Sequence, residues 1–213
     1  MINILIRTSN RPMYFWDCVQ SIKKQTYQDY RIIVGVDGTD TYADFWHPIR
    51  YPMLHSDKTY LKGAYTTMMH FPVNLYLNCL MQEVEEGWVL VLDDDDMFAT
   101  PDALEMIAQN LTELSRVVFW KVDICGRIIP DEKNFGKRPV VKDISMIGFC
   151  FHSNYIPLLQ FDPYKQSDYR VMDRAYSILK PIWIDQILTK TQRNEGESFG
   201  KRRDKDFGVR RNR

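Results

Sequence analysis

The sequence lacks most of the features that would assign the protein directly to a class. No stretch approaches the roughly 18 consecutive apolar residues that a membrane-spanning helix needs, so we expect no transmembrane segment. The 28 basic and 28 acidic residues cancel to a net charge of zero. Without an overall field of one sign, binding to nucleic acid or to an acidic membrane surface is not favoured. The charge therefore predicts no nucleic acid partner.

Cysteine is scarce and poorly spaced for cross-linking. The four cysteines lie far apart in the chain, at Cys18, Cys79, Cys125 and Cys150. They lack the paired spacing of a zinc site or a disulfide framework, and we interpret them as buried thiols in a reducing compartment. The apolar run over residues 1–6 is too short for a signal sequence. Together these absences predict a soluble, cytoplasmic protein.

The composition that is present is typical of a globular domain. Hydrophobic residues make up 45% of the 213 positions and charged residues 26%, which are ordinary values for a soluble fold. No internal repeat and no linker rich in glycine, serine or proline divides the chain. We therefore predict one domain, with a first half over residues 1–97, a second half over residues 98–193 and a basic tail over residues 194–213.

Hydrophobic periodicity predicts an α/β fold built on a mostly parallel sheet. Buried strands are predicted over residues 2–6 and 31–36. Between them apolar residues recur at helical spacing, at Phe15, Cys18, Val19 and Ile22. A strand, a helix and a strand in so short a stretch predict a right-handed crossover between parallel strands. Further helices are predicted over residues 72–86, from Thr100, and over 167–179, and further strands over 88–91, 117–124 and 182–188.

Four consecutive aspartates, Asp93 to Asp96, follow the predicted strand over residues 88–91. Two unit charges roughly 4 Å apart repel by about 4 kcal/mol at an effective dielectric near 20. The run therefore needs solvent, protons or a cation to offset its charge. It is either a solvated acidic loop or a metal site. Ligands in open α/β sheets lie beyond the carboxyl ends of strands, which favours the metal site.

Strand alternation refines the prediction of a metal site. It would place Asp93 and Asp95 on one side of the strand and Asp94 and Asp96 on the other. Asp93 and Asp95 would then form an Asp-x-Asp pair able to share one cation. Ligand sets made only of oxygen suit Mg²⁺ or Mn²⁺ better than Zn²⁺. We therefore predict Mn²⁺ or Mg²⁺ as the cofactor.

Several motifs taken in order resemble the family 2-like glycosyltransferases of the GT-A fold. The resemblance is close over about the first hundred residues, through residues 4–12, 21–22, 25–27, 29–34 and 37–40 and then the aspartate run. It continues more weakly through Ser167-Asp168-Tyr169 with Arg174, through Ile184-Asp185, and through Gln192-Arg193 with Ser198. It implies a GT-A fold, with a nucleotide-sugar-binding half over residues 1–97 and an acceptor and catalytic half over 98–193.

The resemblance also implies a reaction and its partners. A UDP-sugar would be the donor, and an acceptor hydroxyl of a glycan or glycoprotein would receive the sugar with inversion at the anomeric carbon. A divalent metal would bind the diphosphate. The alternative from another class of chemistry is a metal-dependent nucleotidyl or phosphoryl transferase.

For the donor site, the resemblance implies roles for residues at the ends of the first two predicted strands and for the aspartates. Arg7, Thr8 and Arg11 would line the donor pocket. Asp37 would accept from the uracil N–H, although an aspartate before Gly38 is also a common turn residue. Lys62, or alternatively Arg50 or Lys58, could supply positive charge to the phosphates. Asp95 would be the principal metal ligand, while Asp93 or Asp94 would hold the ribose or the metal's water shell.

Asp168 matches the family position that serves as general base. As the first acid of a helix it is also suited to complement the helix dipole, and Asp173 is a rival base. Asp93 and His152 are further candidate metal ligands, but a lone histidine after a core strand is more often structural. The basic tail is either folded over the donor phosphates, bound to an acidic surface, or disordered.

Overall fold

The first strand, helix and second strand form as their sequence pattern predicts. The computed structural model describes residues 1–9, 11–37, 41–51 and 74–192, with only the backbone for Asp37 and Tyr51. Strand β1 (Ile2–Thr8) is buried along its whole length, because both faces of the sheet are covered. Helix α1 (Pro12–Lys23) buries the predicted apolar face. Strand β2 (Tyr30–Asp37) pairs in parallel with β1, which confirms the predicted crossover unit.

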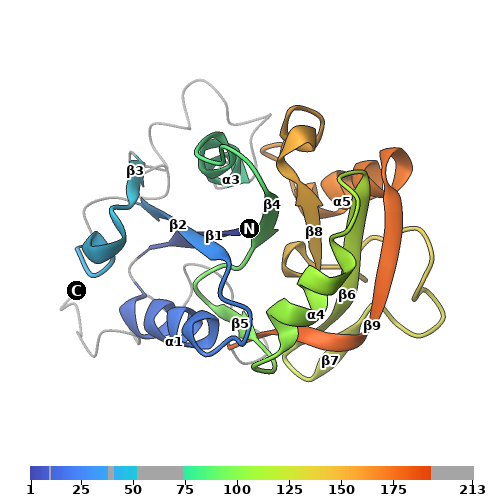
Figure 1. The fold of residues 1–213 in the computed structure, drawn as a ribbon, viewed down its shortest axis with the longest axis horizontal. Coiled ribbons are helices and arrows are strands. Elements are labelled where there is room, and N and C mark those ends of the chain that lie inside the picture. Colours follow the sequence, from blue (N-terminus) through green and yellow to red (C-terminus); the bar gives the residue numbers. More distant parts are fainter. Residues whose placement is uncertain (10, 38–40, 52–73, 193–213) are drawn as a thin grey trace, which may run out of the picture.

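The described strands form one mixed sheet (Figure 1). Their order is β3-β2-β1-β4-β8-β6-β9-β5, with β7 paired to β6. Strands β3, β2, β1 and β4 are mutually parallel, β6 and β9 run in the same direction, and β8, β5 and β7 run against them. The other strands are β3 (Ile49–Tyr51), β4 (Trp88–Val91), β5 (Asp96–Phe98), β6 (Arg116–Ile124), β7 (Arg127–Ile129), β8 (Phe149–His152) and β9 (Lys180–Thr191).

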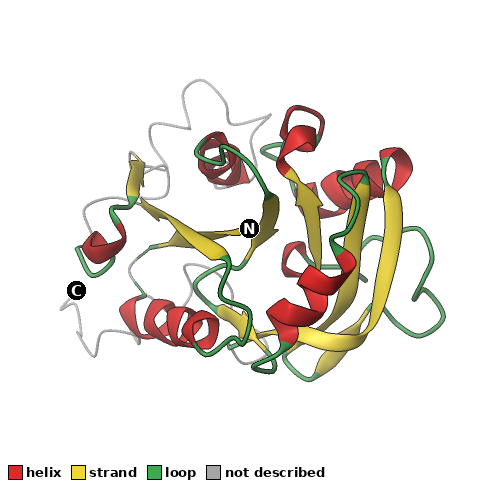
Figure 2. Cartoon of the chain, in the orientation of Figure 1, coloured by secondary structure: helices red, strands yellow, loops and turns green. Residues whose placement is uncertain are grey.

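Helices cover both faces of the sheet, so the architecture has three layers (Figure 2). Helices α1 and α4 (Ala103–Asn110) pack on one face, with Ile4 of β1 in their core. Helices α3 (Asn74–Gln82) and α5 (Ser167–Ile178) pack on the other face, with Leu5 in theirs. Strands β1 and β4 lie in the middle of this sandwich. The polar residues that follow these two strands therefore lie at the carboxyl edge of a sheet whose two faces are both covered by helices.

Three short 3₁₀ turns complete the described part of the chain. They are η1 (Asp44–Trp46), η2 (Met146–Gly148) and η3 (Ser153–Leu158). Gly87 precedes β4 with φ of 96°, and an added Cβ would lie 2.7 Å from the carbonyl oxygen of Met1. Only glycine fits there without strain. The close approach lets β4 begin directly beside β1.

Some predicted boundaries differ from the structure. The helix expected from Thr100 begins at Ala103 and ends at Asn110. The last strand is longer than predicted, because pairing with both β6 and β5 extends it to Thr191. Cys18 and Cys150 are buried as expected, whereas the other two cysteines are only partly buried.

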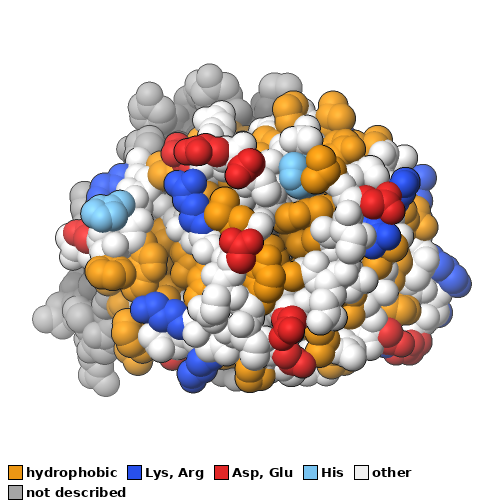
Figure 3. Space-filling model, viewed as in Figure 1, with side chains coloured by type: hydrophobic (Ala, Val, Ile, Leu, Met, Phe, Trp, Pro, Cys, Tyr) orange, Lys and Arg blue, Asp and Glu red, His pale blue; other side chains and the backbone are white. Residues whose placement is uncertain are grey.

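The surface is mixed in charge, as the net charge leads one to expect. On the face seen in Figure 3, acidic and basic side chains of the described residues are interspersed among apolar and polar ones. Within the described residues, no helix is both long and apolar enough to cross a membrane.

Candidate active site

The aspartate run continues beside β1 and then turns sharply. The amide of Leu92 donates to the carbonyl of Leu5 at 3.0 Å, and the amide of Asp94 donates to the carbonyl of Arg7 at 3.3 Å. The amide of Asp96 then donates back to the carbonyl of Asp93 at 2.9 Å. This is the hydrogen bond of a four-residue β-turn. The predicted strand alternation of the carboxylates is therefore wrong, since Asp94 occupies a turn and not a strand.

Two arginines from the end of β1 and the start of α1 hold the carboxylates of this turn. Arg7 donates to Asp93, with its Nε 2.9 Å from Oδ1. Arg11 binds Asp94 through two nitrogens, with Nε 3.2 Å from Oδ2, and its Nη1 lies 3.0 Å from Asp95 Oδ2. We call these five residues, Arg7, Arg11, Asp93, Asp94 and Asp95, the arginine–aspartate cluster.

The cluster is buried, so the run is not a solvated acidic loop. Asp94 is fully buried, and Asp95 and Arg11 are each 5% exposed. The charges of Arg7 and Arg11 offset much of the repulsion that the sequence alone assigned to a cation. Thr8 adds a hydrogen bond, its Oγ1 donating to Asp94 Oδ2 at 2.7 Å. The electrostatic need for a bound metal is therefore weaker than the sequence suggested.

Burial and the neighbouring charges oppose each other in setting the pKa values of the cluster. Desolvation raises the pKa of Asp94 to about 7, against the opposing effect of Arg11 and with a smaller contribution from Asp95. Burial lowers the pKa of Arg11, but the charges of Asp94 and Asp95 outweigh it and the pKa is raised. Burial also lowers the pKa of Arg7, but the charge and hydrogen bond of Asp93 and the charges of its neighbouring aspartates together outweigh it, so the pKa is raised. Burial therefore makes Asp94 a weaker acid than an exposed aspartate, in a site whose arginines stay charged.

Asp168 lies in the first turn of α5 and within the electrostatic reach of Arg7. Burial raises the pKa of Asp168, and the positive charge of Arg7 is among the groups that lower it. Asp168 Oδ1 accepts from the amide of Tyr169 at 2.8 Å. Arg7 also contacts Met146 in η2, with Nη2 3.3 Å from the sulfur, and η2 packs against α5. The fold thus brings Asp168 to the side of the sheet where the cluster lies.

Asp173 is placed differently, although it follows Asp168 by little more than one turn. Its two oxygens accept from Arg138 on the surface, and Arg138 Nη2 lies 2.9 Å from Oδ2. The hydrogen bonds from Arg138 lower the pKa of Asp173. A carboxylate so engaged is a weaker base, so of the two candidates the geometry favours Asp168.

His152 lies at the wrong end of the sheet to join the aspartates. Strand β8 runs against β4, and its register pairs His152 with Trp88, the first residue of β4. The aspartates follow the last residue of that strand. The imidazole packs edge-on against the Trp88 ring at a centroid distance of 5.2 Å, and its Nδ1 accepts from the amide of Asn154. The structure thus contradicts the metal role of His152 and gives it a structural one.

The remaining predicted donor residues are only partly described. The backbone of Asp37 ends β2, which is in register with β1 through Thr8 and Val36. Asp37 therefore lies at the same sheet edge as the cluster, but its side chain is outside the described residues. Lys62 lies wholly outside them.

A shared metal fits the cluster better than a resident one. Among the described residues, no three acidic, histidine or cysteine side chains are grouped to hold a metal ion. Mg²⁺ is often bound through one or two carboxylates together with substrate phosphates. Asp95 is buried in the turn at this sheet edge, with its Oδ2 3.0 Å from Arg11 Nη1. We therefore keep Asp95 as the candidate ligand of a metal that arrives with a diphosphate.

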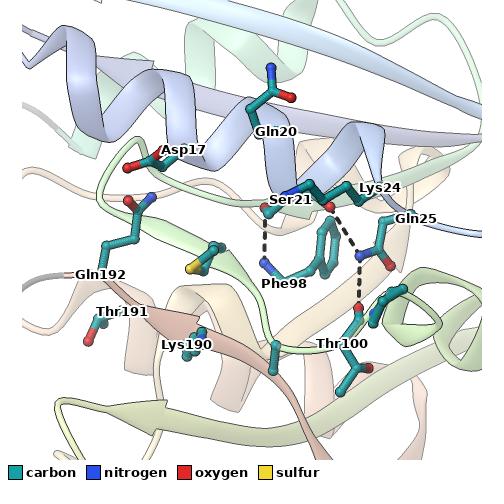
Figure 4. A pocket seen from close by; sticks show the side chains of 13 residues that line it. Asp17, Gln20, Ser21, Lys24, Gln25, Phe98, Thr100, Lys190, Thr191 and Gln192 are labelled. Carbon is teal, nitrogen blue, oxygen red and sulfur yellow. Dashed lines mark hydrogen bonds between the residues drawn. The ribbon is translucent and has the colours of Figure 1, made fainter.

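Two residues to which the sequence gave no role in the donor site also contact this region. Tyr42 places its hydroxyl 2.8 Å from Thr8 Oγ1 and accepts from the amide of Arg11 at 3.4 Å. It lies in a segment whose pattern gave no prediction. Gln192, after β9, donates to backbone carbonyls of the aspartate turn. Its side chain also lines a cavity of about 460 Å³ between α1, β5 and β9 (Figure 4).

Comparisons with known proteins support the fold. No family model matches the chain, and no curated protein matches it. Among solved structures, residues 1–349 of Staphylococcus aureus TarS bound to UDP-GlcNAc are similar, with a TM-score of 0.67 and 17% identity over 92% of this chain and 59% of that one. The same TarS segment bound to UDP matches with a TM-score of 0.66 and 15% identity over 89% and 60%.

A mannosyltransferase from Pyrobaculum calidifontis, in complex with GDP-Man and Mn²⁺, is similar with a TM-score of 0.61 and 12% identity over 90% of this chain and 56% of that one. The chain thus spans about three fifths of the length of these structures. Its α/β fold is that of GT-A glycosyltransferases, as the sequence predicted. At such low identity the likeness defines the fold and not the reaction.

Proposed function

We propose that the protein is a glycosyltransferase that moves a sugar from a UDP-sugar to a hydroxyl of a glycan or glycoprotein acceptor, with inversion and with Mn²⁺ or Mg²⁺ on the diphosphate. The observation that carries this proposal is the buried arginine–aspartate cluster at the carboxyl ends of β1 and β4, with Asp168 within the electrostatic reach of Arg7. In open α/β sheets this edge is where ligands bind. Similar folds bound to UDP-GlcNAc and to GDP-Man with Mn²⁺ add support.

Residues at the ends of β1, β2 and β4 form the donor side. Asp37 accepts from the uracil N–H, and Asp93 holds the ribose or the metal's water shell. Asp94, the other candidate for that role, is fully buried against Thr8 and Arg11 and is not accessible to either. Arg7 and Arg11 line the pocket by holding these carboxylates in place, since both side chains are already committed to them. Lys62 supplies charge to the phosphates. Asp95 holds the metal, which when bound stabilises negative charge on the departing diphosphate.

Asp168 acts as the general base in a single displacement. Its carboxylate takes the proton of the acceptor hydroxyl while the hydroxyl oxygen forms its bond to the anomeric carbon. The bond from that carbon to the diphosphate breaks, and UDP leaves with the electron pair. Burial raises the pKa of Asp168, which makes it a stronger base than an exposed aspartate. Such a base contributes about 10²–10⁴ in rate.

The direct test is a screen of nucleotide sugars for metal-dependent release of UDP, with calorimetry of UDP in Mn²⁺ as the binding measurement. We expect UDP binding that is lost on chelation of the metal. Asp95→Ala should abolish this metal-dependent binding and leave the fold intact. The exposed Asp17 of α1 provides a matched control, since Asp17→Ala also removes one carboxylate but should bind as the wild type does.

Unchanged UDP affinity in Asp95→Ala would remove Asp95 from the metal site. Release of sugar 1-phosphate in place of UDP would instead favour the nucleotidyl transferase alternative. These outcomes are separable because the product that leaves the donor differs between the two reactions.

A further inference from the structure

The three consecutive carbonyls of the aspartate turn all accept hydrogen bonds from one residue, Gln192. The Gln192 amide nitrogen Nε2 lies 3.2 Å from the carbonyl oxygen of Asp94 and 3.0 Å from that of Asp96. The backbone amide of Gln192 donates to the carbonyl of Asp95 at 2.7 Å. The same Nε2 lies 3.2 Å from the carbonyl oxygen of Tyr14 in α1. One side chain therefore joins the turn to the helix that follows β1.

Gln192 is itself held in place by the strand that it follows. Strand β9 pairs with β5 so that Thr191 lies opposite Asp96. The hydroxyl of Thr191 accepts from the amide of Cys125 at 3.1 Å, and the hydroxyl of Thr189 donates to the carbonyl of Ile147. These contacts fix the end of β9 and therefore also fix the backbone position of Gln192, which directly follows the strand.

The geometry points to Gln192 as a positioning residue for the donor and metal site, acting through the backbone of the aspartate turn. The inference rests on the proposed function for its consequence in catalysis. Arginines hold the side chains of the turn, whereas Gln192 holds its main chain. The direction of the Asp95 carboxylate depends on both, because a shift of the turn backbone moves the carboxylate with it.

The surroundings of Gln192 make the inference testable by substitution. Its side chain lines the cavity between α1, β5 and β9 (Figure 4). Truncation to alanine would therefore enlarge an existing cavity and would not open a void in the core. Water that enters would replace some of the lost hydrogen bonds. We expect Gln192→Ala to fold and to melt close to the wild-type temperature.

The effect on the reaction should be much larger than the effect on stability. A misplacement of about 1 Å can lower the rate about 10²-fold, and we expect a loss of that order in transfer by Gln192→Ala. The KM for the donor should rise while the KM for the acceptor stays unchanged. A role limited to stability would not separate the two constants.

Gln192→Glu distinguishes hydrogen-bond donation from packing. Glutamate has nearly the same shape as glutamine, but it places a carboxylate against three carbonyl oxygens. Donation predicts a larger loss for Gln192→Glu than for Gln192→Ala, whereas packing alone predicts a smaller one. Lys190→Ala is the matched control, because Lys190 lines the same cavity but has no described side-chain hydrogen bond or ion pair with the turn, and it should keep wild-type activity.

Hydrogen exchange of the Asp96 amide tests the inference without any substrate. That amide closes the turn by donating to Asp93, so its exchange should be faster in Gln192→Ala and unchanged in Lys190→Ala. Wild-type exchange and wild-type donor KM in Gln192→Ala would overturn the positioning role. If the wild-type protein binds no nucleotide sugar, the proposed function fails, and the exchange of Asp96 alone then decides whether Gln192 orders the turn.

Discussion

Asp94 and Asp173 are both held by two nitrogens of an arginine, yet their pKa values move in opposite directions. Burial raises the pKa of Asp94 to about 7 despite Arg11, whereas the hydrogen bonds of Arg138 lower the pKa of Asp173. The pairs differ in burial: the Arg11 side chain is 6% exposed and that of Arg138 is 62% exposed. The balance between desolvation and the arginine therefore decides the direction of each shift: desolvation prevails for Asp94 and the arginine prevails for Asp173.

Asp168 lies between these extremes. It is partly buried, with no direct ion pair to a described arginine, and burial raises its pKa. A carboxylate of raised pKa that is not tied to an arginine can accept a proton from a substrate, whereas the other two are occupied. The comparison thus separates three roles for the same side chain: a buried structural acid, a candidate base and a surface ion pair.

The largest expected effect is on catalysis by the candidate base. Asp168→Asn removes the proton acceptor and keeps the shape, so transfer should fall by about 10²–10⁴ while UDP affinity is retained. The acid limb of kcat/KM in the wild type should lie above the usual aspartate pKa, and activity should fall as the pH falls through it. Steady-state kinetics and calorimetry measure the two quantities. Full activity in Asp168→Asn, with loss in Asp173→Asn, would reverse the assignment.

The second largest expected effect is on the free energy of unfolding, through the buried pair of Arg11 and Asp94. Arg11→Met leaves Asp94 without its guanidinium, and breaking a buried pair costs about 3–5 kcal/mol. Urea unfolding at pH 8 should show a loss of that size. The loss should shrink toward pH 5, because Asp94 then carries a proton and no longer needs its partner. A loss that stays constant over this range would show that Asp94 does not titrate there.

A smaller effect is the pH dependence of wild-type stability. The folded protein binds the Asp94 proton more tightly than the unfolded chain does, since the pKa is about 7 when folded and about 4 when unfolded. The free energy of unfolding should therefore fall as the pH rises from about 4 to about 7. Asp94→Asn should flatten this slope. Carboxyl groups whose pKa is lowered by folding make the free energy of unfolding rise with pH, but they do so below this pH range.

The smallest expected effect on stability comes from the surface pair of Arg138 and Asp173. Arg138→Ala should change the free energy of unfolding too little to resolve by chemical denaturation, because exposed pairs contribute little. The pKa of Asp173 should return toward its usual range, as followed by carboxyl-carbon NMR. If Arg138→Ala proves as destabilising as Arg11→Met, then burial is not what distinguishes the two pairs.

Much of the fold could be predicted from local pattern. The strand over residues 2–6, the helix that buries Phe15 and Cys18, and the second strand follow from apolar periodicity, and the structure confirms them. Boundaries were less predictable. Strand β9 extends beyond its apolar core because β5 pairs with its polar end. No local pattern in the sequence predicts this pairing, since the partner strand lies some ninety residues earlier.

The location of the candidate site was also predictable, but its chemistry was less so. A polar run after a buried strand places Asp93 to Asp96 at the sheet edge. The sequence could not show that Arg7 and Arg11 would neutralise the run, because they lie more than eighty positions earlier. Nor could it show that β8 runs against β4, which carries His152 away from the aspartates.

By itself the amino-acid sequence determined the alternation of strands and helices, the acidic edge and the absence of a long apolar segment, because each depends on neighbouring residues alone. Only the tertiary structure decided which charges meet and how deeply they are buried. The physical reason is desolvation: the same aspartate is a strong or a weak acid according to how much water the surrounding chain excludes.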